Sequence, residues 1–123
     1  MKTKKLFLTS ILLLLFSTVS IAQKELSDSE TQNFFRLIKQ TNEYNVLHAK
    51  ADSINKKQPN KAPQEIDIHI VKKTNGDSED HIFHAVLERT IIGMALEGYY
   101  FSYDKQKKQI ISIQKQQSHL QIN

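Results

Sequence analysis

The chain has 123 residues, a formal net charge of +4 and no cysteine. The lack of cysteine excludes disulfide bonds, thiol chemistry and a lipid anchor attached to a cleavage-site cysteine. Three lysines within the first five residues carry most of the net positive charge, so the remaining chain lacks the basic surface of a nucleic-acid-binding protein.

Residues 1–22 have the pattern of a cleavable signal peptide. The N-terminal lysines precede an apolar run over residues 6–21, and the small residues Ser20 and Ala22 occupy positions −3 and −1 of a cleavage site. Serines and threonines dilute the run, and its densest part is shorter than a membrane-spanning helix requires. We therefore expect cleavage rather than anchoring, and a bacterial protein that is periplasmic or secreted.

Removal of this segment leaves 14 basic residues against 13 acidic ones, and the formal net charge falls to +1. A near-neutral chain of about 100 residues supports a single small domain with a modest core. We expect one domain over residues 23–123 with flexible ends, no stable membrane anchor and no nucleic-acid partner.

The first part of this domain has the pattern of an amphipathic helix. Ser27 and Glu30 match a capping box, with Ser29 as a rival N-cap. Apolar residues then recur three and four positions apart, which predicts one kinked helix or two consecutive helices over about residues 29–56. Asn42 is a candidate cap for a second helix.

Strand patterns follow the helical part. Two prolines within residues 56–63 predict a loop. Three isoleucines over residues 65–73 alternate with polar residues, which predicts a half-buried strand, and the Asn-Gly pair at 75–76 predicts a turn. Residues 99–103 and 109–113 flank a lysine-rich segment, which predicts a hairpin with a charged tip.

The segment between these strands, residues 81–96, fits two patterns. As a helix it would start from a cap at Ser78, and as a central strand it would be apolar on both faces. Since the flanking strands need a partner between them, we expect a strand over 81–90 and a connection near Gly93. The glutamine-rich tail from Gln114 is expected to fray.

Together these elements predict an α+β fold. An N-terminal helix, kinked or divided into two consecutive helices, would pack on a three- to four-stranded antiparallel sheet. This order of elements is similar in topology to that of PepSY-like and cystatin-like domains, and no family motif accompanies it.

No pattern in the sequence is typical of catalysis or cofactor binding. The serines lie outside nucleophile motifs, and the three glycines form no phosphate-binding loop. His81 and His84 form an H-x-x-H pattern that could bind zinc on a helix, with His69 or His119 as a third ligand. On a strand the same spacing sends them to opposite faces. We therefore expect no enzyme, no cofactor and no metal site.

The candidate partner-binding residues lie in the C-terminal hairpin. Alternation along the strand exposes Tyr100 and Ser102 if the neighbouring aromatic residues face the core. An exposed aromatic ring gives contact area at low entropy cost, and Lys105 and Lys107 could contact an acidic partner. Such lysines also protect a sheet edge against strand addition. The core-facing aromatic residues would be Tyr99, Phe101 and Tyr103.

These observations predict an exported, non-catalytic binding module that acts through protein–protein interaction at its sheet face or an edge strand. A periplasmic inhibitor or immunity-type protein fits this description. The alternative is a small-molecule carrier or sensor with a pocket between helix and sheet. Its lining would include Phe83, Leu87, Phe101 and Tyr103.

Overall fold

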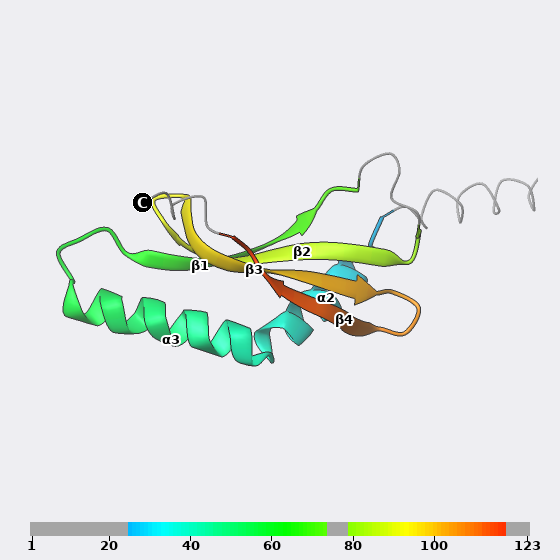
Figure 1. Ribbon diagram of the computed structural model, residues 1–123, viewed down its shortest axis with the longest axis horizontal. Helices are drawn as coiled ribbons and strands as arrows, with labels where there is room; N and C mark the ends of the chain where they lie inside the picture. Colours follow the sequence, from blue (N-terminus) through cyan, green and yellow to red (C-terminus); the bar gives the residue numbers. More distant parts are fainter. Residues whose placement is uncertain (1–24, 74–78, 118–123) are drawn as a thin grey trace, which may run out of the picture.

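The computed structural model describes residues 25–73 and 79–117. Two helices, α2 (Asp28–Lys39) and α3 (Asn42–Lys57), precede four strands. The strands are β1 (Gln64–Val71), β2 (Ile82–Ile91), β3 (Met94–Asp104) and β4 (Gln109–Lys115). They form one antiparallel sheet in the order β1-β2-β3-β4, and both helices lie on the same side of it (Figure 1). The predicted α+β fold is confirmed, with two consecutive helices and four strands.

The two helices begin at side-chain caps. The Ser27 hydroxyl accepts a hydrogen bond from the Glu30 backbone N–H at 3.2 Å, and the Ser27 N–H donates to Glu30 Oε1 at 2.9 Å. This is the predicted capping box, which satisfies two backbone donors at once. The cap of α3 is Thr41 rather than Asn42, because the Thr41 hydroxyl accepts from the Tyr44 N–H at 3.2 Å. The helical region is therefore interrupted at residues 40–41.

The ambiguous segment forms strands, so the helical alternative is wrong. β2 ends at Ile91, and β3 starts at Met94, five residues before the predicted start. Ile92 and Gly93 between them have positive φ angles of 49° and 74°. Two positive φ values are the requirement of a type I′ turn, whose twist matches that of antiparallel strands. The connection predicted near Gly93 is therefore only two residues long, and β2 pairs with β3 up to Ile91.

The C-terminal end of the sheet is longer than expected. β4 extends to Lys115, and the Gln116 N–H donates to the Gly98 carbonyl at 2.9 Å. The prediction that the chain frays from Gln114 is therefore wrong for its first three residues, because backbone pairing to β3 holds them. The predicted signal peptide at 1–22 and the Asn-Gly turn at 75–76 lie outside the described residues.

The core lies between the helices and the sheet. The Phe34 ring of α2 stacks on the Tyr103 ring of β3, with centroids 4.6 Å apart. Phe101 and Tyr103 are fully buried as predicted, and Tyr99 packs against them in part. The fully buried cluster comprises Phe34, Ile38, Leu47, Ala85, Leu87, Phe101 and Tyr103.

Replacement of Ile92 by asparagine should stabilise the protein. A β-branched residue at positive φ is strained, whereas Asn-Gly is the preferred pair of a type I′ turn. Ile92 is also 82% exposed, so the change removes no buried contact. We expect Ile92→Asn to raise the free energy of unfolding by about 1 kcal/mol in urea titrations. Gly93→Ala should lower it, because alanine tolerates the φ of 74° poorly. A less stable Ile92→Asn variant would contradict this account of the turn.

Candidate functional site

The sheet has a helix-covered face and a second face, here called the outer face. Register places the side chains of His84 and Ser102 opposite each other on the outer face, followed by the pair Val86 and Tyr100. This follows from strand alternation, because their neighbours Phe101 and Leu87 belong to the core cluster. Both helices of the described ranges lie on the other side of the sheet (Figure 1).

Tyr100 and Ser102 lie on the outer face as predicted, but Ser102 is not exposed. Its hydroxyl lies 2.9 Å from His84 Nδ1 in a hydrogen bond, and its residue exposure is only 8%. The Tyr100 ring stacks against the same imidazole at 5.2 Å between centroids, and Tyr100 is partly buried. His84 on the adjacent strand therefore covers Ser102, a contact that alternation within one strand does not reveal.

Lys105 and Lys107, the other two predicted residues, lie apart from Tyr100 and Ser102. Lys105 Nζ lies 3.6 Å from Glu30 Oε2 near the start of α2, so its side chain joins the hairpin to the helix. Lys107 is exposed in the hairpin turn, where its backbone N–H donates to Asp104 Oδ1 at 3.1 Å. The four predicted residues thus divide between the outer face, the helix side and the hairpin tip.

The H-x-x-H histidines have separate partners. His81 precedes β2, and its Nε2 lies 3.6 Å from a Glu79 carboxylate oxygen. His84, inside β2, contacts Ser102 and Tyr100 on the outer face. The prediction that this segment forms a strand implied that the two histidines would not share a site.

Sequence reasoning missed the exposed apolar side chains of β4. Ile111 is 48% exposed and Ile113 is 39% exposed. Both lie in β4, which is an edge strand of the sheet. The register of β4 against β3 shifts between Ser102 and Tyr103. An irregularity of this kind places an extra residue on one strand and disturbs alternation. The adjacent isoleucines at 110 and 111 indicated that one apolar side chain would be exposed, because strict alternation cannot bury both.

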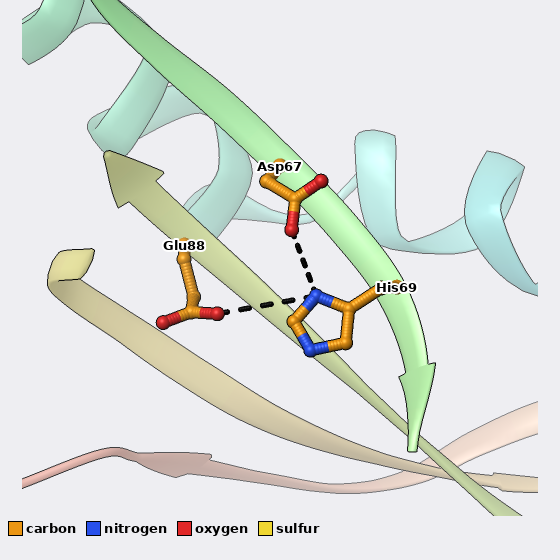
Figure 2. Close-up of side chains that lie close together, drawn as sticks. All are labelled: Asp67, His69 and Glu88. Carbon is orange, nitrogen blue, oxygen red and sulfur yellow. Dashed lines mark hydrogen bonds and ion pairs between the residues drawn. The ribbon is translucent and has the colours of Figure 1, made fainter. Parts of the chain in front are cut away.

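The other edge strand, β1, carries polar groups on its outer face. Asp67, His69 and Glu88 of the adjacent β2 bring one ligand atom each within 4.8 Å of one another (Figure 2). Asp67 and His69 side chains are about half exposed, whereas Glu88 is mostly buried. Within the described residues this is the group whose donors lie close enough to hold a metal ion.

Charged residues also meet where α3 passes the end of the sheet. Arg89 is buried, and its Nη1 donates to Gln64 Oε1 at 2.6 Å. Its Nε lies 3.5 Å from Glu97 Oε1 in an ion pair without a hydrogen bond. Lys50 of α3 donates to both carboxylate oxygens of Glu97 at 3.2 Å. Glu97 therefore compensates a buried guanidinium and attaches α3 to β3.

Two carboxyl groups have lowered pKa values for related reasons. Burial raises the pKa of Glu97, but the Lys50 hydrogen bond and the Arg89 charge outweigh it and bring the pKa below 4.5. Burial also raises the pKa of Glu30, but the hydrogen bonds with Ser27 and the charge of Lys105 outweigh it and lower the pKa. Both groups tie a helix to the rest of the domain, so their ionisation contributes to stability.

No family model, curated protein or solved structure matches the chain in comparisons with known proteins. None of the helices within the described ranges is long and apolar enough to cross a membrane. The function of this protein is therefore inferred from its own residues and their arrangement.

Replacement of Glu97 by glutamine should flatten the acid side of the stability profile. Because the folded-state pKa of Glu97 is lowered, its ionised form stabilises the protein above about pH 4.5. That contribution is lost as the pH falls through the folded-state pKa. We expect Glu97→Gln to be less stable at neutral pH and to lose less free energy of unfolding between pH 6 and about pH 3.

The matched variant is Lys50→Met, which removes one cation beside the carboxylate and keeps Arg89. Its profile should lie between those of the wild type and Glu97→Gln. Denaturant titrations at several pH values measure these slopes. Equal slopes for the wild type and Glu97→Gln would contradict the assignment.

Proposed function

We propose that the protein is an exported, non-catalytic binding module that engages a protein partner through the edge strand β4. The observation that carries the proposal is the exposure of Ile111 and Ile113 on this strand. Export is expected from the signal-peptide pattern of residues 1–22, which lie outside the described residues. A periplasmic inhibitor or immunity-type role remains the proposed class.

The backbone of β4 supports strand addition. β4 pairs with β3 alone in the described sheet, so its other side presents a row of backbone donors and acceptors. An extended segment of a partner can pair with such an edge and place alternate side chains against neighbouring apolar groups. Residues 109–115 contain no proline, glycine or acidic residue that would oppose this pairing.

The two edges of the sheet differ in chemistry. On β1, Glu65, Asp67 and His69 place polar groups on the exposed side of an edge strand, a common protection against unwanted pairing. On β4 the exposed positions include Ile111 and Ile113 instead. An exposed apolar edge is expected to aggregate unless a partner covers it. This contrast supports β4 rather than β1 as the binding edge.

The charges around β4 indicate the partner's chemistry. Lys107 and Lys108 precede the strand, Lys115 ends it, and all three are exposed. A partner strand with apolar residues in its centre and acidic residues near its ends would match this arrangement. Lys107 therefore stays in the proposed interface, while Tyr100, Ser102 and Lys105 serve internal contacts.

The alternative carrier hypothesis receives less support. Leu87, Phe101 and Tyr103, three of its four pocket residues, belong to the fully buried core cluster. Phe83 is 3% exposed and is also part of the buried core. Side chains that pack against the helices in this way supply folding energy rather than a lining for a ligand.

The test compares the wild-type protein with an Ile111→Lys/Ile113→Lys double variant in affinity capture from the periplasm and culture medium. We expect a specific protein to bind the wild type and to bind the double variant at least about tenfold more weakly, since a few central side chains carry most of the binding energy of an interface. Titration of the identified partner by calorimetry measures the difference.

The matched control is Met94→Lys, which also places a lysine at an exposed apolar position of the sheet. It should bind the partner like the wild type, and thermal unfolding should show that all variants fold. Retained binding by the double variant would contradict the proposal. Loss of binding in Met94→Lys, or capture of a small molecule without a protein, would also contradict it.

A further inference from the structure

The outer face carries a three-residue group at the β1 edge, away from β4. Asp67 on β1 pairs directly with Glu88 on β2, and His69 follows Asp67 by two residues on the same face. Figure 2 shows the Nδ1 side of the imidazole turned toward both carboxylates. Strand register places the three Cβ atoms on one face of the sheet, and the side-chain conformations bring the ligand atoms together.

The arrangement brings two like charges together. Carboxylates directly opposite each other on adjacent strands destabilise a sheet. In the structure an imidazole nitrogen lies between them, with Nδ1 2.8 Å from Asp67 Oδ2 and 3.9 Å from Glu88 Oε1. Because a carboxylate only accepts hydrogen bonds, the proton between His69 and Asp67 belongs to Nδ1. A cation in that proton's place would interact with both carboxylates.

The donor distances suit a small divalent ion. Zinc binds nitrogen and carboxylate oxygen at about 2.0–2.2 Å, which places tetrahedral ligand atoms about 3.3 Å apart. The two distances from His69 Nδ1 lie on either side of that value, and all three ligand atoms lie within 4.8 Å of one another. Asp67 and His69 are about half exposed, so small side-chain rotations can equalise the distances without disturbing the core.

We propose that Asp67, His69 and Glu88 form a zinc-binding site, with His69 Nδ1 and one oxygen of each carboxylate as ligands. An imidazole ligand favours zinc over magnesium or calcium, which prefer oxygen ligands alone. Three protein ligands leave one position of a tetrahedral ion for water or a group from another molecule. This proposal departs from the expectation of no metal site, and it uses neither His81 nor His84 of the H-x-x-H pattern.

The test is calorimetric titration of Zn²⁺ into the purified protein with any affinity tag removed. We expect one equivalent to bind the wild type, and His69→Gln, Asp67→Asn and Glu88→Gln each to weaken binding by at least about 10- to 100-fold. Loss of groups that merely support metal ligands has effects of that size. In NMR spectra, Zn²⁺ should shift the His69 imidazole signals before those of other histidines.

The matched control is His81→Gln. His81 has one carboxylate neighbour in the described part of the chain, Glu79 at 3.6 Å, so its loss should leave Zn²⁺ affinity unchanged. Circular dichroism checks that the variants fold, which their exposed or outer-face positions favour. No saturable binding by the wild type, binding unaffected by His69→Gln, or an equal loss in His81→Gln would overturn the proposal. The site lies at the opposite edge from β4, so its failure leaves the partner proposal standing.

Discussion

The packing of Phe34 on Tyr103 fixes the position of α2 and determines which parts of the sheet remain accessible. Both rings are fully buried, and the Tyr103 hydroxyl accepts a hydrogen bond from Asn33 Nδ2 at 2.9 Å. The contact therefore satisfies a polar group as well as burying two aromatic rings, which is the condition under which a tyrosine is stable in a core. The contact holds α2 on the sheet together with the burial of Ile38 and the Glu30–Lys105 ion pair.

A core on one side of the sheet gives the two edges different surroundings. α3 packs beside β1 and β2 on the core side, and β1 keeps acidic and imidazole groups on the outer face. α2 contacts β4, and the isoleucines Ile111 and Ile113 of β4 remain exposed. The outer-face group at β1 has the chemistry of an ion site, whereas β4 has the chemistry of a pairing edge. The two proposed interactions, an ion at the β1 edge and a partner strand at β4, therefore use separate parts of the sheet.

The sequence predicts much of the fold because the signals for it are local. The cap at Ser27 and the burial of Phe101 and Tyr103 follow from patterns within a few residues. The features that matter for the candidate sites depend on register between strands. The burial of Ser102 requires His84 to lie opposite it, and no pattern within one strand specifies that pairing.

The same limit applies to the proposed sites themselves. Asp67 and Glu88 meet only because of the β1–β2 register, and they are far apart along the chain. The exposure of Ile111 follows a register shift between β3 and β4, whereas the adjacent isoleucines at 110 and 111 show only that strict alternation cannot bury both. A local pattern can show that a residue lies in a strand, but the facing residue depends on how the strands align.

The sequential order of the strands has a consequence for how the chain folds. Each strand pairs with its neighbour in the sequence, so pairing between adjacent strands closes only short loops. The connection at Ile92 and Gly93 is the shortest, and the hairpin around it can form first and serve as a template for β1 and β4. Without cysteines, no disulfide step delays this process. A topology dominated by such local pairings favours rapid folding.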